Sequence, residues 1–270
     1  MRSSRSELRR TVALGEHGHD RRFIDIGGGI PVDYLGSADA WDQFWIEHRR
    51  GLLGDREPLT FDGHGLGLIS HRGELVGRPN VYPYHQPLTR ETWLTEVLTG
   101  TVAGRSGTVA EEIRARGIQL RCEPGRALLD GCGITAANVV YRKQRRDGTW
   151  LIGTEMNRTQ CRSTSDDFMV DPLVIRPESE QPAVGASSDP IEGYLVGAYC
   201  IERELLTWRR MRFPEGVSVG DIVVFPNTAG YHMHILESSS HQIPLARNLV
   251  VGANGSARLD PIDAVMAGDR

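Results

Sequence analysis

Two short segments place glycine beside charged side chains in patterns that suit anion binding. The first contains Gly27, Gly28 and Gly29, which directly follow Asp25 and Ile26. Consecutive glycines let backbone N–H groups approach a phosphate closely, because no Cβ atom stands in the way. The same three residues could also form an ordinary structural turn, so the segment by itself leaves both interpretations open.

The second segment is Glu123, Pro124, Gly125 and Arg126, which follows an apolar run at residues 118–122. Proline and glycine together predict a sharp turn, which would let the carboxylate and the guanidinium face the same space. If the run is a strand of a β/α barrel, the turn lies on the face where such barrels hold their active sites. A surface ion pair is the alternative.

A third group of residues lies in the C-terminal half of the chain. Gly197 stands three residues before Cys200, a Gly-Asp pair at residues 220–221 precedes an apolar run, and Gly230 precedes Tyr231. Taken singly, these features predict a small buried thiol, the start of a hairpin and a core aromatic. Their order along the chain is what gives them functional meaning.

The other cysteines and histidines predict no metal site. The four cysteines, at positions 122, 132, 161 and 200, contain no C-x-x-C pair, which is typical of reduced thiols. His232 and His234 alternate along an expected strand and would share one face of it. A third ligand is missing from the pattern.

The elements expected around these segments divide the chain into an α/β part, residues 1–131, and a mostly β part, residues 132–270. The α/β part should contain strands at residues 22–26 and 118–122, helices at 8–14, 38–49, 89–98 and 108–116, and an irregular stretch at 51–88. The β part should contain strands at residues 134–141, 150–156, 191–198, 221–225 and 232–236, with a surface loop at 177–190.

Composition excludes several classes of protein. The net charge of −4 and the pI near 6.1 do not indicate a nucleic-acid-binding protein, which typically carries excess positive charge. The apolar runs are too short to cross a bilayer, and no apolar signal core follows the Arg/Ser-rich first ten residues. We therefore expect a cytoplasmic protein without membrane contact. Of the 31 basic residues, only Lys143 is a lysine.

Together the three segments resemble the diaminopimelate, ornithine and arginine decarboxylases, a family of fold-type III enzymes that use pyridoxal 5′-phosphate (PLP). The resemblance runs from about residue 23 to residue 251. It implies an alanine-racemase-like fold, in which a (β/α)8 TIM barrel is followed by a β domain. Here only the C-terminal part of the barrel would be present, as a PLP-binding region at residues 1–131.

The resemblance also implies roles for single residues. Gly27, Gly28, Gly29 and Arg126 would hold the cofactor's phosphate together with Tyr231, and Pro124 and Gly125 would shape that site. Glu123 would face the pyridine nitrogen and keep it protonated. Cys200 would be the proton donor and would enter from a partner subunit, which implies a homodimer. Arg126 and Tyr231 would also face the substrate.

The sequence departs from the family where the substrate should bind. An acidic residue that binds a distal ammonium group commonly follows the cysteine, but here Ile201 follows Cys200. Either Glu202 has taken over this role or the amino-acid substrate differs, because a buried ammonium group without a partner is costly. Diaminopimelate is therefore only the family's default substrate.

The sequence departs further where the cofactor-binding lysine should be. The family places this lysine on the first barrel strand, far upstream of the triple glycine, whereas Lys143 follows the Glu-Pro-Gly-Arg segment. Three explanations remain: a fragment, half of a split enzyme with an upstream partner, or a degenerate homologue. The function expected is a PLP-dependent amino-acid decarboxylase, a lyase of amino-acid metabolism. The alternatives are an inactive dimerising or ligand-binding module and a racemase relative.

Overall fold

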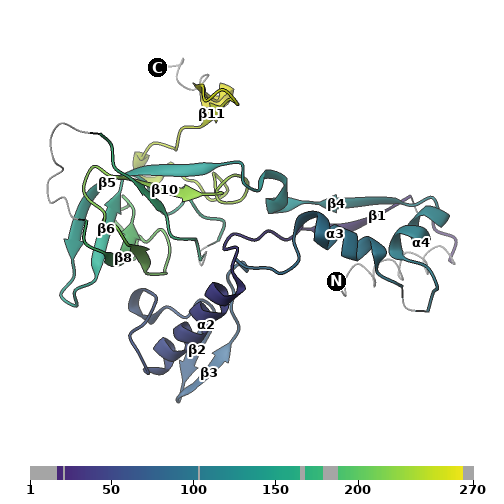
Figure 1. Cartoon of the computed structure of the whole chain (residues 1–270), viewed down its shortest axis with the longest axis horizontal. Helices are drawn as coiled ribbons and strands as arrows, with labels where there is room; N and C mark the ends of the chain where they lie inside the picture. Colours follow the sequence, from purple (N-terminus) through teal and green to yellow (C-terminus); the bar gives the residue numbers. More distant parts are fainter. Residues whose placement is uncertain (1–16, 21, 103, 165–167, 179–187, 264–270) are drawn as a thin grey trace.

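The computed structural model describes residues 17–20, 22–102, 104–164, 168–178 and 188–263. The helix expected at residues 8–14 lies outside these ranges. Three groups of elements are visible in Figure 1: a β1–β4 unit with two helices, a small unit around α2, and a larger β unit. Within the described residues, no helix is long and apolar enough to span a membrane.

The β1–β4 unit carries the two glycine-containing segments. β1 (Phe23–Gly28) and β4 (Gln119–Glu123) form a two-stranded parallel sheet. The helices α3 (Arg90–Thr99) and α4 (Val109–Ala115) lie on the chain between these strands. α4 begins at a capping box, in which Thr108 and Glu111 bond to each other's backbone. Ile24, Val102, Val109, Ile113 and Ile118 form the core of the unit.

The unit around α2 corrects one expectation. α2 (Ala38–Leu53) begins at Ser37, whose side chain accepts a hydrogen bond from Ala40, and ends at left-handed Gly54. Residues 51–88 are not wholly irregular, because β2 (Leu68–His71) and β3 (Glu74–Gly77) form a hairpin there. Its turn has positive φ at Arg72 and Gly73, the conformation typical of a tight hairpin.

The β unit is built on a six-stranded sheet in the order β7-β10-β5-β6-β8-β9. β6 and β8 pair in parallel and the other neighbours are antiparallel. The strands are β5 (Ile134–Gln144), β6 (Trp150–Thr154), β7 (Leu173–Ile175), β8 (Ile191–Val196), β9 (Met211–Phe213) and β10 (Ile222–Pro226). A separate pair, β11 (Leu249–Val251) and β12 (Ala257–Leu259), follows near the C-terminus.

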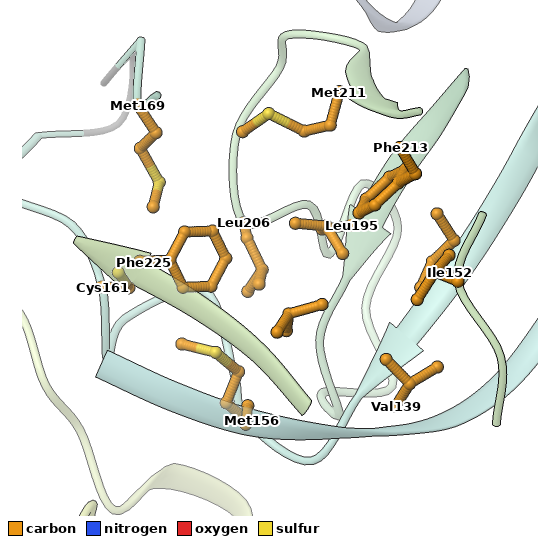
Figure 2. Close-up of a cluster of buried hydrophobic side chains, with 13 residues drawn as sticks. Val139, Ile152, Met156, Cys161, Met169, Leu195, Leu206, Met211, Phe213 and Phe225 are labelled. Carbon is orange, nitrogen blue, oxygen red and sulfur yellow. The ribbon is translucent and has the colours of Figure 1, made fainter. Parts of the chain in front are cut away.

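The largest hydrophobic core lies in the β unit. Figure 2 shows its side chains pointing toward one another from several strands, with Ile152 and Leu195 fully buried between Val139, Phe213 and Phe225. Such a core holds the strands in one register, because a one-residue slip would turn the buried set toward solvent. The strands expected at residues 134–141, 150–156, 191–198 and 221–225 all occur within one to three residues of their expected ends.

The strand expected at residues 232–236 is wrong. Residues 231–236 form turns and bends, and β10 ends at Pro226. His232 is buried, whereas His234 is exposed and lies beside Glu237 and Asn248. The two histidines therefore do not share a strand face. Among the described residues, no group of three His, Cys, Asp or Glu side chains could hold a metal ion.

Candidate active site

The triple glycine and the Glu-Pro-Gly-Arg segment meet at the end of the β1–β4 sheet. Gly28 is paired with Glu123 across the two strands. Just beyond this pair, Gly29 N–H donates to the Glu123 carbonyl at 2.9 Å and Ile30 N–H donates to the Pro124 carbonyl at 3.1 Å. The two turns are thus joined backbone to backbone.

Close approach explains why glycine occupies these positions. A Cβ atom at Gly28 would lie 3.2 Å from Glu123 Oε2, and one at Gly125 would lie 3.4 Å from the Cα of Gly29. Gly27 and Gly29 have φ values of +78° and +84°, which other residues adopt only with strain. The result is a bare backbone surface beside an exposed carboxylate.

Tyr231 reaches the same place from the β unit. Its Cε2 atom lies 3.6 Å from the position that a Cβ on Gly125 would occupy. Tyr231 is 41% exposed, so it is open to solvent at this place. Residues 27–29, 123–126 and 231, which are far apart in the sequence, therefore come together.

Arg126 lies behind this turn and is only 8% exposed. Its Nη1 lies 3.0 Å from His232 Nε2 and its Nη2 donates to Ser163 Oγ at 2.5 Å. Its guanidinium carbon lies 4.1 Å above the centre of the Tyr82 ring. A guanidinium can only donate, so this contact requires His232 Nε2 to accept.

The aromatic side chains of Tyr34, Tyr82 and Tyr84 lie around Arg126 and form an aromatic wall. The fully buried Tyr84 lies with its hydroxyl 3.2 Å from His232 Nε2, and Tyr34 packs at 4.9 Å, ring centre to ring centre, from Tyr84. Burial raises the pKa of the Tyr34 phenol, and a hydrogen bond and the charge of Arg126 partly offset this rise. The neighbouring cavity is only about 10 Å³, room for one water at most, so the wall is packed rather than a pocket.

The structure places Cys200 and Glu202 on the turn that follows β8. Both side chains are exposed, and Cys200 Sγ lies 3.6 Å from His241 Nδ1. Glu204, the next acidic residue, is buried: it accepts a hydrogen bond from the Arg158 N–H at 2.7 Å and forms an ion pair with the Arg158 side chain. Glu204 is therefore part of the β unit's interior, whereas Glu202 faces solvent.

Comparisons with known proteins bear on the fold. A crystal structure of diaminopimelate decarboxylase from Helicobacter pylori complexed with L-lysine matches with a TM-score of 0.54 at 16% identity, covering 98% of this chain and 49% of that one. A crystal structure of diaminopimelate decarboxylase from "m. jannaschi" matches with a TM-score of 0.51 at 12% identity, covering 99% of this chain and 47% of that one. This chain shares the fold of about half of each of these diaminopimelate decarboxylase chains.

Sequence comparison adds one curated relative, the uncharacterized protein y4yA of Sinorhizobium fredii. It is 30% identical over 246 residues, which cover 88% of this chain and 48% of y4yA. The chain thus spans about half the length of the curated relative and of the decarboxylase structures that it matches. No protein-family model matches the sequence.

Within this decarboxylase fold, Lys143 lies far from the turn. It is exposed near the distal end of β5, where it pairs with Leu151 of β6. β5 begins at Ile134, nine residues earlier, so the strand carries Lys143 about 30 Å from its start. A lysine side chain cannot span the length of β5 back to Ile134, the end of the strand that follows the Glu-Pro-Gly-Arg segment in the chain.

Sequence reasoning missed the wall around Arg126. Tyr34, Ser163 and His232 were not expected at the site. Their contacts with Arg126 or with each other join residues 37 to 148 positions apart, and no local pattern indicates such pairs. The available signal was the close spacing of Tyr82, Tyr84 and His85.

Proposed function

We propose that this chain forms the cofactor-ring and substrate side of a PLP-dependent amino-acid decarboxylase. The observation that carries the proposal is the Gly28–Glu123 pair. It sets an exposed carboxylate against a Cβ-free turn, with the Tyr231 phenol beside it. Residues 1–131 would then be the C-terminal part of a PLP-binding barrel, and residues 132–270 the β domain.

The residues present fit one edge of PLP. The carboxylate of Glu123 would keep a proton on the ring nitrogen, because a negative charge favours the pyridinium form. Tyr231 would donate its hydroxyl to the phosphate. The N–H groups of Gly27 and Gly29 already donate to Asp25 and to the Glu123 carbonyl, so the phosphate would rely on Tyr231 and on the positive charge of Arg126.

When bound, PLP supplies an electron sink for the pair released as the bond between Cα and the carboxylate breaks. The chain's own groups would do the rest. Glu123 would hold the ring proton, and Arg126, which contacts Tyr82, Ser163 and His232, would place positive charge behind the turn, on the side where the substrate carboxylate would bind. Cys200 would return a proton to Cα.

The substrate we propose is an amino acid with a second ammonium group. Glu202 is exposed two residues after Cys200, where it could pair with that group. Cys200 would act in the site of a partner subunit, so the active form would be a dimer. The lysine that binds the cofactor would come from a separate polypeptide segment, because Lys143 lies out of reach.

PLP binding tests the proposal. The chain is titrated with PLP, and binding is followed by equilibrium dialysis for wild type, Glu123→Gln and Tyr231→Phe. We expect each substitution to weaken binding about fivefold or more, since each removes one hydrogen-bonding or charged contact. Glu155→Gln and Tyr141→Phe, which change exposed residues on the β unit, serve as matched controls and should leave the affinity unchanged.

Borohydride reduction completes the test. Peptide mass spectrometry should find no PLP adduct on Lys143, and Lys143→Ala should bind PLP as wild type does. Equal affinity of wild type, Glu123→Gln and Tyr231→Phe for PLP would exclude Glu123 and Tyr231 as cofactor ligands. An adduct on Lys143 would overturn the assignment of the lysine to another segment.

A second candidate is a non-catalytic, dimerising module that binds phosphate-bearing ligands. The distance of Lys143 from the turn favours it, as do the exposed apolar side chains beside the turn, Leu128, Leu129 and Ile134. Exposed apolar patches of this kind are typical of interaction surfaces. PLP binding without decarboxylation, in the presence of any lysine-bearing partner, would favour this module over the enzyme.

A further inference from the structure

Two segments of the β unit bring a thiol and an imidazole together. Cys200 lies on the turn after β8, and His241 lies in the 3₁₀ helix at Ser240–Gln242. Cys200 Sγ and His241 Nδ1 are 3.6 Å apart, within hydrogen-bonding range for sulfur, and both side chains are exposed. The pair joins residues 41 positions apart, so the fold rather than the local sequence creates it.

The residues around the pair hold His241 in place. The Tyr199 ring is buried and lies 5.2 Å, centre to centre, from the His241 ring, while the Tyr199 hydroxyl donates to the Ser238 carbonyl at 2.9 Å. Ser240 N–H donates to Ser238 Oγ at 3.1 Å. His241 itself has a φ of +62°, a left-handed conformation that costs about 1 kcal/mol or more outside glycine.

Cys132 provides a contrast within the same chain. It is also exposed, but its Sγ donates to the Asp130 carbonyl oxygen at 3.7 Å. A carbonyl oxygen accepts a hydrogen bond but does not take up the proton. An imidazole can take the thiol proton and then donate it back to the thiolate.

We infer that His241 is the proton partner of Cys200, taking up the proton of its thiol at Nδ1 and restoring it. This inference rests on the proposed function, in which Cys200 donates a proton to Cα. After that donation the sulfur carries a negative charge, and a protonated His241 would stabilise it. Because the His241 ring is exposed, Nε2 could take up a proton from water, and the ring could then pass a proton from Nδ1 to the Cys200 thiolate before the next turnover.

Alkylation kinetics test the pair without cofactor or substrate. The full chain is treated with limiting iodoacetamide at pH 7, and peptide mass spectrometry follows Cys200 and Cys132 in the same sample. The thiol proton passes to His241, the sulfur bonds to the CH2 carbon of the reagent, and iodide leaves. We expect wild-type Cys200 to react at least about fivefold faster than Cys132.

The decisive variant is His241→Asn. Asparagine tolerates the left-handed backbone and has similar polarity, but it cannot take up a proton. Cys200 should then slow to about the rate of Cys132, while the Cys132 rate stays the same and reports that the fold is intact. His71→Asn, at an exposed histidine on β2, is the matched control and should change neither rate.

Two outcomes would overturn the inference. One is that Cys200 of the wild-type protein is alkylated no faster than Cys132, and the other is that His241→Asn leaves the alkylation rate of Cys200 unchanged. A change in the alkylation rates of both Cys200 and Cys132 would show that the substitution disturbs the fold. In that case His241→Gln repeats the comparison, and an unchanged Cys200 rate in that variant counts against the pair. Loss of PLP binding leaves these rates untouched, so failure of the proposed function is distinguished from failure of this pair.

Discussion

Gly28 and Glu123 face each other across the parallel β1–β4 pair, so closely that a single added methyl group would lie 3.2 Å from Glu123 Oε2. That distance is tighter than ordinary van der Waals contact. The carboxylate sits where it does because its neighbour has no side chain. The orientation of Glu123 therefore depends on a residue 95 positions earlier in the chain.

Gly28→Ala should weaken PLP binding while costing less than about 1 kcal/mol of folding free energy. The added Cβ would push the Glu123 carboxylate aside, but the end of a side chain can move without disrupting the sheet. Equilibrium dialysis with PLP and urea denaturation measure the two effects.

Gly107→Ala is the matched control for this crowding. A Cβ at Gly107 would lie 3.3 Å from Glu111 Oε2, a nearly identical clash with a carboxylate at the start of α4. It should leave PLP affinity unchanged. Similar losses of affinity in both variants would show that Gly28 has no special relation to the ligand.

Arg126→Lys should lower the free energy of unfolding by about 2 kcal/mol. Lysine keeps the charge but cannot donate to His232 and Ser163 at once or lie flat on Tyr82. Hydrogen bonds of a buried charged group are worth roughly 1.5–3 kcal/mol, so their loss should be visible in urea denaturation.

The control for Arg126 is Arg121→Lys. Arg121 also stacks on an aromatic ring, at 3.8 Å from the centre of Phe23, but it is exposed. We expect Arg121→Lys to change the free energy of unfolding by no more than about 0.5 kcal/mol. Equal destabilisation of the two variants would mean that stacking, rather than the buried hydrogen bonds, accounts for the effect of Arg126.

Glu204→Gln should flatten the dependence of stability on pH. Burial raises the pKa of the Glu204 carboxyl above its ordinary value of 4.5, although hydrogen bonding and the charge of Arg158 act in the opposite direction. Because the pKa of Glu204 is higher in the folded protein than in the unfolded chain, the protonated carboxyl stabilises the fold. This stabilisation is complete below the pKa of the unfolded chain, and it is lost as pH rises through the pKa of the folded protein.

Urea denaturation between pH 4 and pH 8 measures this effect. Across that range the variant should gain stability relative to wild type, because glutamine keeps an acceptor for the Arg158 N–H without the buried charge. Glu202→Gln, at an exposed carboxylate two residues away, is the comparison. If wild type instead becomes more stable than Glu204→Gln as pH rises, the ion pair between Glu204 and Arg158 outweighs the cost of burying the carboxylate.

Local signals account for the elements that the sequence predicted well. The capping residues Ser37 and Thr108 mark the starts of α2 and α4, and short apolar runs mark β1 and β4. The β2–β3 hairpin was missed because its turn has Arg72 rather than the usual Asn or Asp before Gly73. The strand expected at residues 232–236 failed because the burial of His232 against Arg126 and Tyr84 outweighed the strand-like pattern.

The sequence by itself determined the residue types of the candidate site, the two-part order of α/β and β elements, and the resemblance whose fold the solved structures share. Only the tertiary structure decided that Tyr82, Tyr84 and His232 surround Arg126, that Glu204 is buried while Glu202 is exposed, and that Cys200 meets His241. The physical reason is that backbone conformation follows from neighbours a few residues apart. Contacts between distant side chains depend instead on how whole elements pack, and no short sequence pattern encodes that packing.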